Sequence, residues 1–150
     1  VVEMGRYSQV GWFKRLRKDD KEKAHEAIKQ MEMENFTYRH ISELSGGQQQ
    51  RVFLARALAQ DASLYFMDEP LAGIDKKTEK MIIETLKTMQ AHGKTIVVVH
   101  HDLNTVSSYF DHVILLNQKI IAQGPVTNTF TQENIDLAFF SRVEEGDNNV

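Results

Sequence analysis

The sequence predicts an α/β fold with a mostly parallel sheet and flanking helices. Short apolar runs at 64–67 and 95–99 have the length and composition of buried parallel strands. Stretches in which apolar residues recur at helical spacing precede both runs, so helices and strands alternate along the chain. Two further strands are expected at 113–116 and 120–122, joined by a turn at Asn117–Lys119.

Helix ends are marked by Ser, Asp and Gly, the residues that commonly cap or stop helices. Ala24, Ile28 and Met31 give the first helix an apolar face. The helices expected are one that Asp19 and Asp20 cap and that runs to about Glu34, one that Ser45 opens, one from Asp75 to Gly93, and a short one over 104–109.

Composition allows one domain of ordinary size and excludes several classes of protein. The chain has 150 residues, 41% of them hydrophobic and 26% charged, which is enough for a packed core. The net charge of −3 is too balanced to suggest a nucleic-acid binder or a polybasic anchor. No cysteine is present, which excludes disulfides and thiolate metal sites. The basic cluster at 14–18 is best explained as a solvated loop, with an anionic partner as the alternative.

The most informative segment is Leu44–Arg51, with the sequence Leu-Ser-Gly-Gly-Gln-Gln-Gln-Arg. Gly46 and Gly47 let the backbone approach a ligand closely, and the following helix directs its free N–H groups and its positive dipole end at the same place. The hydroxyl of Ser45 adds a donor. This arrangement suits a terminal phosphate, although Ser-Gly-Gly alone is better explained as a helix cap without a ligand.

Two carboxylates follow the first apolar run. Asp68 and Glu69 come directly after 64–67, and ligands of open α/β sheets bind at the carboxyl ends of the strands. An Asp there can hold Mg²⁺ through water, and a neighbouring Glu can orient or deprotonate an attacking water. A turn or helix cap is the competing interpretation. It is weaker here because burying charge at the end of an apolar strand without a partner is costly.

A tight turn and a pair of histidines complete the set. Ala72–Asp75 predicts a turn into a helix, and Asp75 by itself would be an N-cap. The run 95–99 ends in His100 and His101, and a histidine at a strand end can hydrogen-bond a γ-phosphate or the attacking water. A metal site made by both histidines is disfavoured because neighbours on a strand point to opposite faces.

In order and in spacing, these segments resemble the ATPase subunits of ATP-binding-cassette (ABC) transporters. Leu44–Arg51 resembles the signature motif, 64–69 the Walker B strand, and Ala72–Asp75 the D-loop. The resemblance implies that Glu69 and His101 are the catalytic groups, with His101 as the switch histidine, and that Asp68 holds Mg²⁺ through water. It also implies that ATP held by a second subunit is contacted by Ser45, Gly46, Gly47 and Gln48. Asp75 would belong to the D-loop.

Two features depart from the family's pattern. The residue before the switch histidine is usually Thr or Ser, and here it is His100. No Gly-x-x-x-x-Gly-Lys-[Ser/Thr] loop is present. Gly93-Lys94-Thr95 imitates its end, but Thr88 stands where the first glycine is required. We therefore expect a C-terminal fragment that lacks the Walker A loop, the glutamine loop and the adenine-stacking aromatic, and that is inactive alone.

The resemblance also implies a division of the chain. Residues 1–45 would be part of the helical (signature) subdomain, 46–141 the C-terminal part of a P-loop NTPase core, and 142–150 a disordered tail. Without the strand that enters the missing loop, 95–99 and 113–116 would present unpaired apolar edges. We expect such a chain to aggregate, to self-associate, or to rearrange so that these two strands meet.

Local similarities at Met4–Tyr7, Tyr109–Asn117 and Gly124–Pro125 are to ATPase subunits of manganese, zinc and iron-chelate importers. They imply an ATP-hydrolysing subunit that powers metal-ion import, uses ATP and Mg²⁺, and lies peripherally at the cytoplasmic face of the cell membrane. Its implied partners are a second ATPase subunit in a homodimer, a membrane permease and, indirectly, an extracellular substrate-binding protein, with no nucleic acid.

Two other functions fit part of the sequence. A non-transport ABC ATPase, of the kind that acts in DNA repair or translation, would be expected to carry a long inserted coiled coil or a repeated cassette, and the sequence has neither. A neighbouring permease gene would argue against it. A catalytically incomplete module could instead offer only its signature segment in trans, and ATP binding measured on the 150-residue chain would distinguish this from an enzyme.

Overall fold

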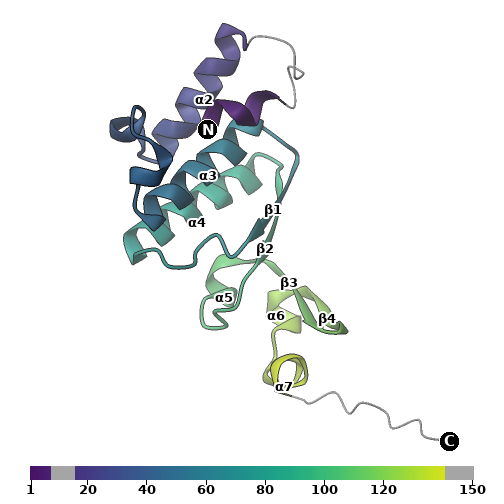
Figure 1. Cartoon of the computed structure of the whole chain (residues 1–150). Helices are drawn as coiled ribbons and strands as arrows, with labels where there is room; N and C mark the ends of the chain where they lie inside the picture. Colours follow the sequence, from purple (N-terminus) through teal and green to yellow (C-terminus); the bar gives the residue numbers. More distant parts are fainter. Residues whose placement is uncertain (8–15, 141–150) are drawn as a thin grey trace, which may run out of the picture. The chain divides into compact units, whose positions relative to one another are not determined.

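The computed structural model describes residues 1–7 and 16–140, which fall into two compact units, Val1–Val99 and His100–Val150 (Figure 1). The expected tail at 142–150 and the first two residues of the basic cluster lie outside the described residues. Each unit is described separately below.

The first unit consists of helices and a parallel pair of strands. Its elements are η1 (Val2–Arg6), α2 (Lys18–Gln30), η2 (Glu34–Phe36), η3 (Ile41–Glu43), α3 (Gly46–Gln60), β1 (Leu64–Asp68), α4 (Lys76–Ala91) and β2 (Thr95–Val99). β1 and β2 pair in parallel register, from Leu64 opposite Thr95 to Asp68 opposite Val99. The expected α/β class, with a parallel sheet and flanking helices, is confirmed.

The first helix differs from its expected limits at both ends. α2 begins at Lys18, and the carboxylate of Asp20 lies inside its first turn, where it accepts a hydrogen bond from the backbone N–H of Arg17 at 3.1 Å. The helix ends at Gln30 rather than near Glu34. Glu32 adopts a left-handed conformation with φ 52°, and the N–H of Met33 donates to the carbonyl of Ile28 at 3.0 Å. This is the pattern of a Schellman termination, made here without the usual glycine.

The caps expected for the next two helices are confirmed. Ser45 is the N-cap of α3, and Asp75 is the N-cap of α4. Beyond α4, Gly93 takes the left-handed conformation, with φ 80°, that lets the chain turn into β2. α3 ends at Gln60, and its C-cap, Asp61, is also left-handed, with φ 53°.

One face of the β1–β2 pair is covered by helices and the other is open. The core of this unit draws on α2, α3 and α4, and Met67, Ile96 and Val98 pack against it from the strands. The alternate residues are exposed, with Phe66 at 76% and Val99 at 58%. The expectation of two fully buried strands was therefore wrong. Successive side chains of a strand point to opposite faces, and the described helices cover only one of them.

The second unit contains a hairpin and three short helices. Its elements are α5 (Val106–Tyr109), β3 (His112–Asn117), β4 (Lys119–Pro125), α6 (Val126–Thr129) and α7 (Gln132–Phe139). β3 and β4 pair in antiparallel register with an irregularity between Leu115 and Leu116. Gln118, with φ 56°, makes the expected turn between them. α5 begins later than the expected residue 104, because the preceding residues form a separate turn.

The strands form two separate two-stranded sheets, β1 with β2 and β3 with β4. The rearrangement in which 95–99 and 113–116 pair with each other is not formed among the described residues. Within the described residues, each of the four strands β1, β2, β3 and β4 therefore has one edge that pairs with no other strand. Of the helices in the described ranges, none has both the length and the apolar character needed to cross a membrane.

Candidate nucleotide site

The candidate phosphate-binding segment forms the start of α3. Ser45 Oγ accepts a hydrogen bond from the backbone N–H of Gln48 at 3.3 Å, and Gln48 Oε1 accepts one from the backbone N–H of Ser45 at 2.9 Å. This reciprocal capping box fixes the first turn. The N–H groups of Gly46 and Gly47 belong to the first turn, which has no acceptors within the helix. Gly46 is exposed, so an anion can approach this helix start from solvent.

The start of α3 lies beside the turn that follows β1. Gln50 Nε2 donates to the carbonyl oxygen of Pro70 at 3.0 Å. A Cβ atom added at Gly47 would lie 3.8 Å from Ile74 Cγ2, which is ordinary van der Waals contact. The signature-like segment and the D-loop-like segment, which are separate in the sequence, are therefore neighbours in the first unit.

The two expected carboxylates lie at the carboxyl end of the strand pair. Asp68 is the last residue of β1 and pairs with Val99. The next residue, Glu69, donates its backbone N–H to the carbonyl of Val99 at 3.1 Å and accepts from the N–H of Ala72 at 3.1 Å. Both acidic residues are exposed. Their position is the edge of the sheet at which ligands of open α/β folds bind.

Glu69 also has an unusual backbone conformation. Its φ is 45°, in the left-handed region that costs a non-glycine residue about 1–3 kcal/mol. The hydrogen bonds to Val99 and Ala72 hold it there. Among the described residues, Glu32, Asp61 and Gln118 share this conformation, so it shapes the turn after β1 and does not by itself assign a role to the Glu69 side chain.

Asp75 is engaged as a helix cap. Its Oδ1 accepts hydrogen bonds from the N–H groups of Lys77 and Thr78, each at 3.0 Å, and its Oδ2 accepts one from the Thr78 hydroxyl at 2.7 Å. The bond from the Thr78 hydroxyl, aided by the backbone N–H groups, lowers the pKa of Asp75 below its ordinary value. The local role of Asp75 is to begin α4 and so to hold the end of the D-loop-like turn.

His101 belongs to the second unit, where it follows the half-buried His100 and is itself exposed. His100 Nε2 is 2.7 Å from Thr105 Oγ1, and its ring lies 5.4 Å from the ring of Phe110, centroid to centroid. Across the described ranges, no three His, Asp or Glu side chains gather closely enough to hold a metal ion. The other expected site residues lie in the first unit, whereas His101 lies in the second.

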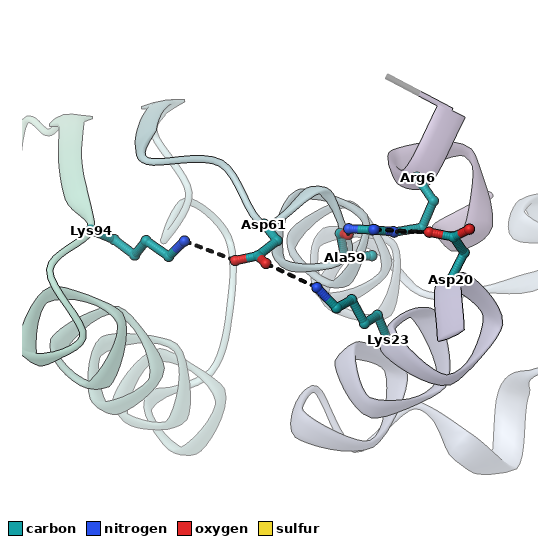
Figure 2. Close-up of polar contacts among 6 residues, drawn as sticks. All are labelled: Arg6, Asp20, Lys23, Ala59, Asp61 and Lys94. Carbon is teal, nitrogen blue, oxygen red and sulfur yellow. Dashed lines mark hydrogen bonds and ion pairs between the residues drawn. The ribbon is translucent and has the colours of Figure 1, made fainter. Parts of the chain in front are cut away.

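Two polar clusters that brace α3 were not foreseen from the sequence. In the first, Asp61, just beyond the end of α3, accepts hydrogen bonds from Lys94 Nζ at 2.8 Å and Lys23 Nζ at 3.2 Å (Figure 2). The bond from Lys94, followed by that from Lys23, lowers the pKa of Asp61. Asp61 therefore joins α2, the end of α3 and the start of β2.

The second cluster is a buried ion pair between Arg6 of η1 and Asp20 of α2 (Figure 2). Arg6 donates to Asp20 Oδ1 from Nε at 3.0 Å and from Nη2 at 2.8 Å, and its Nη1 donates to the carbonyl of Ala59 at 3.0 Å. The bonds from Arg6 lower the pKa of Asp20. The interacting residues of both clusters are far apart in the chain, so no short sequence pattern predicts that they meet.

Comparisons with known proteins agree with this arrangement. The family model described as ABC transporter matches residues 3–72. The zinc transport system ATP-binding protein TroB of Treponema pallidum is 56% identical over 143 residues, which are 95% of this chain and 54% of that protein. The manganese transport system ATP-binding protein MntB of Halalkalibacterium halodurans is 50% identical over 151 residues, covering 97% of this chain and 60% of that protein.

A solved structure shows the same fold. The dimeric structure of MJ0796, a bacterial ABC transporter cassette, has 32% sequence identity and a TM-score of 0.72 over 83% of this chain and 54% of its own. The chain thus spans little more than half the length of the relatives that it matches. The sequence similarity, the fold and the adjacent signature-like and D-loop-like segments lead to one conclusion: over nearly its whole length the chain is similar to ABC transporter ATP-binding proteins.

Proposed function

We propose that the chain acts as part of an ATP-hydrolysing subunit that drives metal-ion import through an ABC transporter. The observation that carries this proposal is the contact between the start of α3 and the turn after β1, made by Gln50 with Pro70 and by Gly47 beside Ile74. This contact joins the start of the signature-like helix to the turn that follows the two strand-end carboxylates. The relatives named as zinc and manganese transport ATP-binding proteins support metal as the transported substrate.

Hydrolysis would depend on Glu69 and Asp68. Glu69 would orient or deprotonate the water that attacks the terminal phosphate, and the strained backbone would aim its side chain. Mg²⁺, when bound with ATP, would neutralise charge on the phosphates. Asp68 is an exposed carboxylate at a strand end, which fits such an ion because Mg²⁺ keeps several waters and phosphate oxygens as its other ligands.

His101 would complete the catalytic set by hydrogen-bonding the terminal phosphate or the attacking water. Its support is its place two residues after the end of β2 and its exposure to solvent. A histidine can make either bond because its ring nitrogens can donate and accept hydrogen bonds. Catalysis of this kind consists of positioning and of electrostatic stabilisation rather than covalent chemistry.

The partners follow from the exposed signature-like segment. Ser45, Gly46, Gly47 and Gln48 would close over ATP bound by a second copy in a homodimer, and Asp75 would hold the D-loop beside that interface. The dimer of the related cassette MJ0796 supports this assembly. We further propose a membrane permease as partner, a substrate-binding protein acting through it, and a peripheral location at the cytoplasmic face of the membrane.

A second candidate function is favoured by one observation. The 150 residues contain no Gly-x-x-x-x-Gly-Lys-[Ser/Thr] loop, so the chain by itself would offer its signature segment in trans without binding ATP tightly. Equilibrium binding of ATP to the 150-residue chain tests this. We expect very weak binding and no hydrolysis, and tight binding would contradict it.

The proposed function is tested with Glu69→Gln in the full-length subunit that carries this sequence. The amide cannot accept the proton of the attacking water, so we expect ATP binding to persist while hydrolysis nearly stops. Glu84→Gln, at an exposed residue of α4, is the matched control and should hydrolyse ATP at the rate of the unaltered protein. Near-normal turnover in Glu69→Gln would contradict the proposal.

A further inference from the structure

The residue before His101 makes a side-chain bond across its own turn. His100 Nε2 lies 2.7 Å from Thr105 Oγ1, and the Thr105 hydroxyl donates to the backbone carbonyl of Asp102 at 3.0 Å. His100 and Thr105 are both half-buried. The ring of His100 therefore spans the turn that begins with His101 and Asp102.

These two bonds fix the position of a proton on His100. A hydroxyl group has one hydrogen to donate, and a carbonyl oxygen can only accept. Because the Thr105 hydrogen is directed to the Asp102 carbonyl, Thr105 Oγ1 must accept the other bond. His100 Nε2 consequently carries a hydrogen and is the donor, and in the neutral ring Nδ1 carries none.

The same turn is closed by further contacts. The backbone N–H of Thr105 donates to the carbonyl of Asp102 at 3.2 Å. Asp102 Oδ1 accepts from the backbone N–H and from the side-chain amide of Asn104, each at 3.1 Å. On its other side the His100 ring meets the edge of the Phe110 ring, with centroids 5.4 Å apart. The residues on both sides of His101 are thus anchored.

We propose that His100 is a positioning residue, whose Nε2–H bond to Thr105 fixes the turn that presents His101. The inference rests on the proposed role of His101 in hydrolysis. A hydroxyl at position 100, as in the Thr or Ser typical of the family, would end closer to the backbone than Nε2 does and could not reach Thr105 without moving the turn. His100 and Thr105 therefore act as a matched pair.

The first test measures steady-state ATP hydrolysis by the full-length subunit. His100→Phe keeps an aromatic ring and removes the donor, and Thr105→Val keeps the shape and removes the hydroxyl. We expect each to lower kcat roughly tenfold or more, with little change in KM for ATP, because displacing a catalytic group by about 1 Å can cost a hundredfold. The double variant should be no worse than either single variant, because both remove the same bond.

Conservative variants provide the rescue. His100→Gln keeps a donor at similar reach, and Thr105→Ser keeps the hydroxyl, so both should retain most of the kcat. Ser107→Ala, at an exposed residue of α5, is the control for a neutral change nearby. Equal losses in His100→Phe and His100→Gln would overturn the inference, because shape rather than the hydrogen bond would then decide the rate.

The second test reads the proton directly. Long-range proton–nitrogen NMR correlation spectra of the full-length subunit, with its histidines isotope-labelled, should show His100 with hydrogen on Nε2. A neutral His100 protonated only at Nδ1 would overturn the inference. This readout is independent of ATP hydrolysis.

A third arm separates this inference from the proposed function. His101→Ala should nearly stop hydrolysis. If it does so while His100→Phe and Thr105→Val hydrolyse ATP at the normal rate, the positioning role alone is overturned. If His101→Ala hydrolyses ATP normally, the role proposed for His101 fails and the positioning role fails with it.

Discussion

The side-chain amide of Gln50 donates a hydrogen bond to the carbonyl oxygen of Pro70 at 3.0 Å. Gln50 lies one turn inside α3, and Pro70 follows the two strand-end carboxylates. This bond joins the helix start, proposed to meet ATP held by a second subunit, to the turn that follows the carboxylates proposed to serve the attacking water in the chain's own site. The bond thereby holds α3 and the turn after β1 in a fixed position relative to each other.

Replacing Gln50 by Leu should therefore affect both stability and activity. Gln50→Leu conserves the approximate volume and removes the donor, so we expect the free energy of unfolding to fall by about 1 kcal/mol. Hydrolysis by the full-length subunit should fall as well. Chemical denaturation and an ATPase assay measure the two effects. Gln123→Leu, at an exposed residue of β4, is the control, and equal behaviour of the two variants would count against a role for Gln50.

The Lys23–Asp61–Lys94 cluster predicts loss of stability in acid. The pKa of Asp61 is held below its ordinary value of 3.8, first by Lys94 and then by Lys23. A lowered pKa in the folded state gives stability that is present above the unfolded pKa and is lost as pH falls through the folded pKa. Asp20 and Asp75 shift in the same direction. Stability should therefore decline as pH falls below about 4.

Asp61→Asn isolates the share of this effect that belongs to the cluster. The amide has no charge to lose, so the variant should be less stable than the unaltered chain near neutral pH and should show a smaller further loss in acid. Thermal unfolding followed between neutral and acid pH provides the measurement. An unchanged acid-side slope in Asp61→Asn would show that this cluster contributes nothing to it.

Gly5 predicts a second stability effect, caused by close approach of the backbone. A Cβ atom added at Gly5 would collide with the carbonyl oxygen of Arg56 in α3, whereas one added at Gly46 would meet nothing within 4 Å. We expect Gly5→Ala to lower the free energy of unfolding by roughly 1–3 kcal/mol. Gly46→Ala is the control and should unfold like the unaltered chain. Comparable losses in the two variants would contradict the packing of η1 on α3.

The open face of the β1–β2 pair predicts self-association of the 150-residue chain. Phe66, in the middle of β1 on this open face, is 76% exposed. In the described part of the chain, each strand also has an edge without a strand partner. Such surfaces recruit other chains. Light scattering after size exclusion should show species heavier than a monomer, and Phe66→Lys should reduce them. Tyr38→Lys, at a fully exposed residue outside the sheet, should not. A monodisperse monomer would refute this expectation.

Local signals explain which parts of the fold the sequence predicted. Ser45 and Asp75 cap α3 and α4 through bonds to residues two or three positions away, so a short window of sequence is enough to find these helix starts. The end of α2 was missed because Glu32 takes the left-handed conformation that usually marks a glycine. A helix end was predicted correctly where its capping residue is of a type common in that conformation, as at Ser45 and Asp75, and was missed where it is not, as at Glu32.

Features that depend on distant partners could not be predicted. The run at 64–67 indicated a strand, but nothing within it told that helices would cover only the face of Tyr65 and Met67. The hydrogen-bond partners of Asp61, which are Lys23 and Lys94, and the partner of Gln50, which is Pro70, lie many positions away in the sequence. The motifs themselves were local, and so the signature-like segment and the carboxylates could be found before their contact was known.

The central claim, that the signature-like segment acts on ATP held by a second subunit, is tested most directly by ATP-dependent dimerisation of the full-length Glu69→Gln subunit. Light scattering should show a monomer without ATP and a dimer with it, because ATP is bound but not hydrolysed. Adding Ser45→Arg should abolish the dimer while monomeric ATP affinity stays unchanged. A Ser45→Arg variant that loses ATP affinity as a monomer, or that still dimerises fully, would contradict the account.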